Sequence, residues 1–254
     1  MVKIYQLFIM THGFGSYFCI NLLIHKNRMI FFFILKIKYV FISYMVLFEI
    51  NKLDSKYYSI TISNPIFNDF LSLFNIEFKK NNQSVDIDCK SIVYLNDFLL
   101  DFQDSLITYD YAYGFSQNIV KQILYLEKQK KTIIAFSLDD FIVIDKSFLV
   151  FVNFKKITDI QNNNITILSP YSKNNNTFFI TKIMKENNNL PLSIHYKNIY
   201  LSLAYLILYC LYEKHYFDNK DNDKLMSNLL GTKLYYFLQN CLTESQENRH
   251  VCFF

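Results

Sequence analysis

Hydrophobic and polar residues follow a strand pattern between Ile133 and Ile157, in two β-rich runs joined by Asp145-Lys146-Ser147. Alternation of apolar and polar residues is typical of a strand with one buried face, and two such runs around a short polar turn predict a β-hairpin. Upstream, Ser116 to Lys131 has apolar residues at three- and four-residue spacing, which predicts a helix with Ser116 as its N-cap. The pattern therefore predicts a helix, a short loop and a hairpin in that order.

Other segments carry weaker or different patterns. Tyr196 to Tyr212 is apolar on almost every face, which predicts a helix buried in the centre of a domain, and its apolar run is too short to span a bilayer. Between Leu225 and Leu242 the apolar residues recur at helical spacing and predict one or two amphipathic helices around Gly231. Asn64 to Phe78 fits a helix and a strand equally well.

The order of helix, loop and hairpin resembles the catalytic centre of protein kinases, where a helix leads into an HRDLKxxN loop, a strand, and a second strand ending in DFG. Ala135-Phe136-Ser137-Leu138 stands at the HRDL position, Phe141 falls near the metal-binding Asn, and Asn153-Phe154-Lys155 stands at DFG. A kinase needs one carboxylate to accept the substrate proton and another to hold magnesium. Neither Ser137 nor Asn153 carries a charge near neutral pH. The resemblance is therefore to a degenerate kinase, a pseudokinase.

The N-terminal part carries a further resemblance to the kinase N-lobe. The segment Gly13 to Ile20 resembles the glycine-rich loop over the ATP phosphates, with Gly13 and Gly15 present and the third glycine replaced. The apolar run that follows ends in Lys36, which stands where the family has its ATP-pairing lysine. The resemblance implies Glu49 as the helix αC partner of this lysine, although it comes early for that role. Gly13, Gly15 and Lys36 are thus the candidate nucleotide-binding residues.

The C-terminal part adds matches of the same kind. Ser91 to Phe102 stands where a kinase has its interlobe hinge and a short helix. Ser202-Leu203-Ala204 matches the last three positions of the DxWSxG start of the central kinase helix αF, and Ile199 replaces its aspartate. Arg249 stands at the position of a buried arginine, and residues 181–183, at the APE position, lack its glutamate partner.

These matches imply an α+β fold of the two-lobed protein kinase type, with a mostly helical C-lobe and a small or degenerate N-lobe. We expect residues 1–95 to form the degenerate N-lobe or a hydrophobic N-terminal extension, and residues 96–254 to form the kinase-like C-lobe.

A membrane segment is an alternative for the N-terminus, because Ile4 to Ile24 and Met29 to Phe48 are both strongly apolar. In the second span Lys36 and Lys38 each cost about 2.5–3.5 kcal/mol at a bilayer centre, which roughly offsets the gain from its apolar residues. Polar residues and two glycines interrupt the first span. An N-lobe is therefore favoured over a membrane segment, and a disordered extension is the third alternative.

The composition excludes few functional classes, but it indicates the cellular compartment of the protein. The net charge is +4 and the lysines are scattered, which disfavours a nucleic-acid-binding surface. Five cysteines without CxxC spacing disfavour a zinc site and indicate a reducing compartment, the cytoplasm, with membrane association left open. Only two of 26 basic residues are arginine and Trp is absent, a bias typical of AT-rich genomes such as those of large DNA viruses.

We therefore expect a pseudokinase that acts as a binding or regulatory module for a protein partner, with no cofactor or with weakly bound ATP and magnesium. Ser137 marks the degenerate base position and Asn153 the degenerate metal position, and Lys155 would lie near the vacated metal site. Asp139, two residues after the base position, supports the alternative of an active but atypical Ser/Thr kinase that uses ATP. A membrane-anchored scaffold protein is the other alternative.

Overall fold

The computed structural model describes residues 4–9, 18–23, 48–54, 56–62, 64–81, 84–102, 107–168, 177–178, 190–212 and 225–251. The chain divides into two compact units, Met1–Leu47 and Phe48–Phe254. In the first unit, β1 (Ile4–Ile9) and β2 (Phe18–Leu23) form an antiparallel pair with Ile4 opposite Leu23. All other elements that the structure describes belong to the second unit.

The second unit begins with a four-stranded antiparallel sheet in the order β3-β4-β6-β5. Its strands are β3 (Glu49–Lys52), β4 (Tyr57–Thr61), β5 (Phe78–Lys80) and β6 (Ser84–Asp88). Alternate residues of β4 and β6 are buried, so one face of the sheet packs against the core. The buried residues on this face are Tyr58, Ile60, Val85 and Ile87. The strands pair antiparallel with Ile60 opposite Val85.

Helix α2 (Pro65–Leu73) connects β4 to β5 and resolves the ambiguous pattern of that segment. The side chain of Asn64 accepts a hydrogen bond from the N–H of Ile66, and Pro65 occupies the first helical position. Both residues favour the start of a helix, since Asn caps free N–H groups and Pro lacks one. The end of the same segment, from Phe78, enters β5.

Strand β7 (Ile92–Tyr94) and the short helix α3 (Leu95–Leu100) lead to the long helix α4 (Tyr109–Lys128). The short helix within residues 91–102 is confirmed. The predicted N-cap of the long helix was wrong, because α4 begins at Tyr109 and its cap is Thr108, whose Oγ1 accepts from the N–H of Tyr111 at 3.5 Å. Ser116 lies inside the helix, fully buried, and its hydroxyl donates to the carbonyl of Tyr113.

The predicted hairpin is confirmed as β10 (Phe141–Ile144) and β11 (Phe148–Phe151), with Ile142 opposite Val150. Asp145 and Lys146 of its turn have φ values of 51° and 57°, a left-handed conformation common in tight hairpin turns. Strand β7 pairs with the other edge of β10, so the sheet order is β11-β10-β7. All four residues of β10 are buried, because the strand is covered on both faces.

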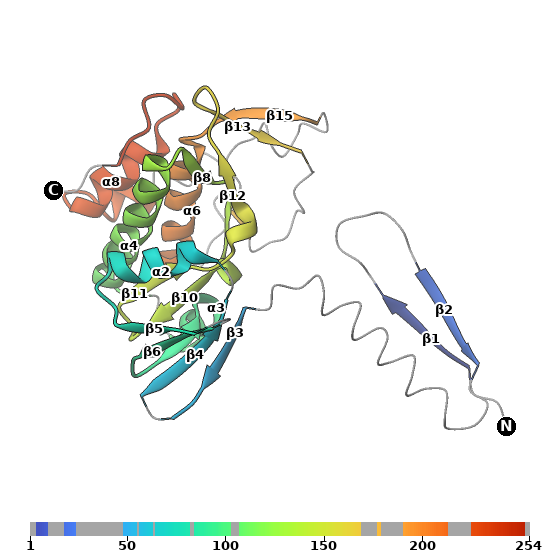
Figure 1. Cartoon of the computed structure of the whole chain (residues 1–254). Helices are drawn as coiled ribbons and strands as arrows, with labels where there is room; N and C mark the ends of the chain where they lie inside the picture. Colours follow the sequence, from blue (N-terminus) through green and yellow to red (C-terminus); the bar gives the residue numbers. More distant parts are fainter. Residues whose placement is uncertain are drawn as a thin grey trace. The chain divides into compact units, whose positions relative to one another are not determined.

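The central helix is α6 (Asn198–Tyr212), and the prediction of a buried helix there is confirmed. It packs against both α4 and α8 (Lys233–Leu242), and the three helices lie together on one side of this unit in Figure 1. A helical turn at residues 225–227 and α8 flank Gly231, whose φ is 79°, as the amphipathic pattern predicts. One hydrophobic core contains residues of α2, α4, the β10–β11 hairpin, α6 and α8.

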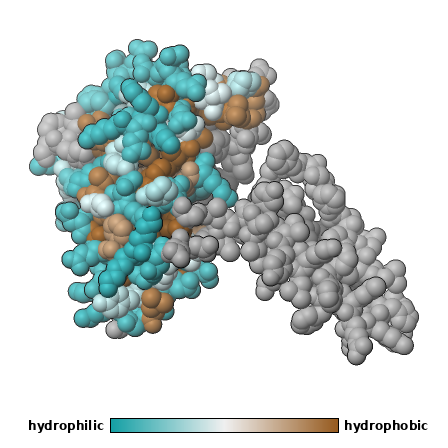
Figure 2. All heavy atoms as spheres, in the orientation of Figure 1, coloured by the Kyte–Doolittle hydropathy of each residue, from teal (hydrophilic) through white to brown (hydrophobic). Residues whose placement is uncertain are grey.

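Short strand pairs complete the unit. Strand β8 (Lys131–Ile133) pairs with β12 (Ile157–Asp159), β9 (Phe136–Ser137) with β14 (Thr177–Phe178), and β13 (Asn164–Ile167) with β15 (Leu192–His195). Hydrophilic side chains cover much of the face in Figure 2, and hydrophobic ones gather where β13 and β15 lie. Among the helices that the structure describes, none is both long and apolar enough to cross a bilayer.

Candidate functional site

The candidate site is built on the loop between β8 and β10. Within it, β9 is followed by a 3-10 turn, η1 (Leu138–Asp140), and Ser137 is the N-cap of that turn. The side chain of Asp140 accepts a hydrogen bond from the N–H of Ser137 at 2.7 Å, and the side chain of Ser137 accepts one from the N–H of Asp140. This reciprocal capping box fixes the Asp140 carboxylate beneath the loop.

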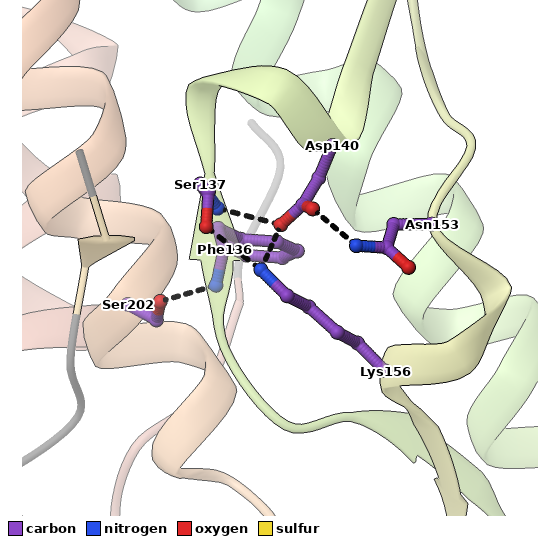
Figure 3. A network of polar contacts seen from close by, with 6 residues as sticks. All are labelled: Phe136, Ser137, Asp140, Asn153, Lys156 and Ser202. Atoms are coloured by element: carbon purple, nitrogen blue, oxygen red, sulfur yellow. Dashed lines mark hydrogen bonds and ion pairs between the residues drawn. The ribbon is translucent and has the colours of Figure 1, made fainter. Parts of the chain in front are cut away.

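Asp140 is the centre of a polar network inside the protein (Figure 3). The residue is only 2% exposed, and Lys156 extends from the 3-10 turn η2 (Phe154–Lys156) to place its Nζ 2.5 Å from Asp140 Oδ2. The same Nζ donates to Ser137 Oγ at 2.7 Å. On the other side of the carboxylate, the amide of Asn153 donates to Oδ1 at 2.7 Å. The buried negative charge is therefore neutralised by an ammonium, and both of its oxygens accept hydrogen bonds.

Helix α6 holds the same loop from the other side. The hydroxyl oxygen of Ser202 accepts a hydrogen bond from the N–H of Phe136 at 3.3 Å, and both residues are fully buried (Figure 3). The ring of Phe136 packs against those of Phe141 and Phe151, with centroids 5.2 and 6.1 Å away. Polar contacts to α6 and an aromatic cluster beneath the loop together fix the position of Ser137.

The structure brings Ser137 and Asn153 together and leaves Asp139 apart from them. Ser137 and Asn153 both bond Asp140, a residue that the sequence analysis did not select. Asp139 is exposed, and none of the hydrogen bonds described for this network involves it. Phe141, expected near a metal-binding position, is fully buried in the aromatic cluster.

The lysine that enters the site is not the expected one. Lys155 was expected near the metal position, but its side chain is exposed, and the adjacent Lys156 reaches Asp140. The η2 turn rotates neighbouring side chains by about a third of a turn, so only one of the two can face the loop. The sequence did contain a signal for this ion pair. Asp140 stands directly before a run of four apolar residues, and an aspartate that is buried with such a run is normally paired with a cation.

The candidate nucleotide-binding residues of the N-terminus, Gly13, Gly15 and Lys36, lie outside the described residues. Glu49, expected on a helix as the partner of Lys36, is instead an exposed residue at the start of β3. That expectation was wrong. Helix α2 follows in the next part of the chain, and the rings of its Phe67 and Phe70 lie 6.4 and 6.1 Å from the ring of Phe154. Helix α2 therefore contacts the segment that resembles DFG through aromatic packing.

The buried arginine also has partners that the sequence did not show. Arg249 is 4% exposed and donates to the side-chain oxygen of Asn198 on α6, to the carbonyl of Thr243 at 2.8 Å and to that of Glu244 at 3.4 Å. Burial lowers the pKa of its guanidinium. Neutral oxygens thus take the place of the glutamate whose absence was expected, and they tie the C-terminal segment to α6.

The donor set at Asp140 does not suit magnesium. A magnesium ion prefers several free oxygen ligands, whereas the oxygens of Asp140 accept from Lys156, Asn153 and Ser137. A cation placed there would also lie beside the ammonium of Lys156, and like charges repel. In the described parts of the chain, no group of three or more His, Cys, Asp or Glu residues is arranged to hold a metal ion.

Comparison with known proteins identifies no relative: no protein-family model and no curated protein matches the sequence.

Proposed function

We propose that the chain is a degenerate protein kinase-like domain, a pseudokinase, that serves as a binding or regulatory module for a protein partner. The observation that carries this proposal is the ion pair of Asp140 and Lys156, which bonds both Ser137 and Asn153. Support for the kinase-like arrangement comes from the order of elements: a long helix, a loop, a hairpin and a buried central helix. As part of this proposal, the chain has the two-lobed α+β fold of kinases. Its two lobes divide near residue 95, and Ser137 and Asn153 stand at the degenerate base and metal positions.

The chemistry of the site argues against phosphoryl transfer. Such transfer depends on charge placed to orient the nucleophile and to neutralise the phosphates. At the expected base position Ser137 is a neutral hydroxyl whose oxygen accepts from Lys156, and at the expected metal position Asn153 donates its amide to Asp140. The one buried carboxylate of the loop is already paired. The network is thus arranged to hold the loop together.

Nucleotide binding, where it occurs, should be weak and independent of magnesium. An ammonium has three N–H donors, and Lys156 uses two of them for Ser137 and Asp140. Its positive charge is the feature that would attract a phosphate group at this site. We therefore expect no cofactor, or ATP bound weakly without a metal.

A cytoplasmic location fits this proposal. Cys89 and Cys210 are buried free thiols, and free thiols persist in a reducing compartment.

The alternative of an active, atypical Ser/Thr kinase rests on one specific observation. Asp139 is exposed in the loop, two residues after Ser137, and is therefore accessible to a substrate hydroxyl. A general base must lie within hydrogen-bond reach of the proton that it removes. Within the expected catalytic set, Asp139 is the residue with a carboxylate, and its exposure leaves it open to such a contact.

Phosphate transfer from labelled ATP separates the two functions. The full-length chain should transfer no label to itself or to casein with magnesium or manganese present, and its melting temperature should respond to ATP equally with magnesium and with EDTA. A magnesium-dependent signal that Asp139→Asn abolishes and Asp101→Asn leaves intact would refute the pseudokinase proposal. Asp101 is the matched control because it is an exposed aspartate at the end of α3.

A further inference from the structure

A pocket of about 300 Å³ lies where the end of α2, the end of β6 and the β10–β11 turn meet. Its apolar wall is formed by Phe74, Ile76, Ile144 and Phe148. The rings of Phe74 and Phe148 lie 5.6 Å apart and are tilted by 32°. These three segments are far apart in the sequence, so the pocket is a product of the tertiary fold.

Three carboxylates also line this pocket: Glu77, Asp88 and Asp145. Glu77 and Asp88 are exposed, whereas Asp145 is half-buried. Among the described residues that line the pocket none is basic. We call it the acidic pocket, and it combines an apolar wall with net negative charge in a chain whose overall charge is +4.

The carboxylate of Asp145 is held in place before any ligand arrives. Its Oδ1 accepts hydrogen bonds from the backbone N–H groups of Lys90 and Ser91, at 2.7 and 3.0 Å. The N–H of Asp145 donates in turn to the carbonyl of Ser91 at 2.9 Å. These contacts use one carboxylate oxygen and lock the hairpin turn to the segment after β6, so the wall of the acidic pocket is rigid.

Two further features of the lining residues concern charge. Burial raises the pKa of the Cys89 thiol in its wall to about 12, and the negative charges of Asp145 and Asp88 add to the effect. On the chain itself, the Nζ of Lys121 lies 5.9 Å from the centre of the Phe74 ring, a cation–π contact. The two aspartates thus disfavour a thiolate at Cys89, and the ring of Phe74 already contacts one ammonium.

We propose that the acidic pocket binds a lysine or arginine side chain of a protein partner, with an apolar residue of the same segment packed beside it. Long basic side chains bury an apolar stem and keep a charged tip near carboxylates, which is the complement of this pocket. Its volume is at the low end of the range of about 300–1,000 Å³ for small-molecule sites, so a side chain fits better than a larger cofactor. The inference rests on the proposed function of binding a protein partner and names the chemistry of that partner, and it is independent of whether the chain transfers phosphate.

Two matched peptides test this proposal on the full-length chain by fluorescence anisotropy. The probe is fluorescein-Gly-Leu-Arg-Leu-amide, and its control replaces arginine by citrulline, which has nearly the same shape without the charge. We expect the arginine peptide to bind about tenfold more tightly, and this preference should shrink in 0.5 M NaCl because salt screens exposed charges. Equal affinities for the two peptides would overturn the proposal.

Variants locate the binding. Asp88→Asn and Glu77→Gln neutralise exposed carboxylates, so the fold should be preserved, and each should weaken binding of the arginine peptide about two- to fivefold. The double variant should lose most of the preference for arginine, and the remaining carboxylate, Asp145, accounts for the rest. Asp101→Asn, an exposed aspartate outside the pocket, should change nothing. An arginine preference that is undiminished in the double variant, with an unchanged melting temperature, would place the binding elsewhere and refute the acidic pocket as the site.

Discussion

Lys156 Nζ lies 2.5 Å from Asp140 Oδ2, and this ion pair joins the loop after β8 to the turn after β11. The two residues are sixteen positions apart, and the β10–β11 hairpin between them brings their backbones back together. Because Asp140 is almost fully buried, removing its cation would leave a charge with no water to solvate it. The pair is therefore both the centre of the candidate site and a condition for the stability of its loop.

Lys156→Met should lower the free energy of unfolding by about 3 kcal/mol, because it leaves Asp140 buried without a cation. Urea denaturation followed by circular dichroism measures the loss. Adding Asp140→Asn to the same chain should restore part of it, since an amide carries no charge to desolvate. Lys155→Met is the matched control, because this neighbouring lysine is exposed and its loss should stay within about 0.5 kcal/mol. A loss equal to that of the control would show that the ion pair contributes nothing to stability.

The side chain of Gln122 on α4 hydrogen-bonds to backbone groups at the outer edge of β11, where a further strand would otherwise pair. Its amide nitrogen donates to the carbonyl of Leu149 at 2.8 Å, and its oxygen accepts from the N–H of Phe151 at 2.9 Å. Gln122→Leu would leave these two buried backbone groups unpaired, so we expect a loss of about 2–4 kcal/mol in the same assay. Lys128→Ala, at the exposed end of the same helix, should have little effect. A nearly neutral Gln122→Leu would mean that water reaches this edge.

Leu206 lies fully buried at the middle of α6. Leu206→Asp would place an unpaired carboxylate in the core and should prevent stable folding, whereas Leu206→Ala should cost about 2–5 kcal/mol through the cavity that it leaves. Soluble yield and the thermal unfolding transition report both effects. Leu230→Asp is the control, because Leu230 is 62% exposed and the change should leave folding intact. Near-native stability of Leu206→Asp would show that α6 is not the central helix.

The carboxyl of Glu127 on α4 has a raised pKa because it is partly buried against α6. Burial raises the pKa of its carboxyl above the ordinary 4.5, although the hydroxyl of Tyr200, which donates to Oε1 at 2.7 Å, acts in the opposite direction. A raised folded-state pKa means that the folded protein binds the proton more tightly than the unfolded one. Stability from this group is therefore present below pH 4.5 and is lost as the pH rises through the folded pKa.

Glu127→Gln keeps an oxygen acceptor for Tyr200 and removes the titration. The variant should be more stable than the parent near neutral pH, and this advantage should vanish as the pH falls toward 4. Unfolding free energies measured between pH 4 and pH 8 give the difference directly. Glu244→Gln, a change at an exposed acidic residue outside this contact, is measured alongside as the matched control. A pH-independent difference for Glu127→Gln would contradict the assigned role of burial.

Elements with a local signal were predicted from the sequence with little error. The β10–β11 hairpin needs only two apolar runs and a polar turn, and α6 needs only a long run of apolar residues on every face. The N-cap of α4 was misplaced by eight residues, because Ser116 and Thr108 are both good N-caps and only packing distinguishes them. In the folded chain Ala112 and Phe115, upstream of the predicted start, are already part of the core.

The sequence by itself determined which segments form the hairpin and the central helix, and which residues of the candidate site lack charge. Periodicity and side-chain chemistry are properties of short segments, so no tertiary contact is needed to recognise them. Only the tertiary structure decided that Lys156 rather than Lys155 pairs with Asp140, and that Glu77, Asp88 and Asp145 share one pocket. Both arrangements depend on strand register and on the packing of α2 against the hairpin, which bring together residues that are 11 to 68 positions apart in the chain.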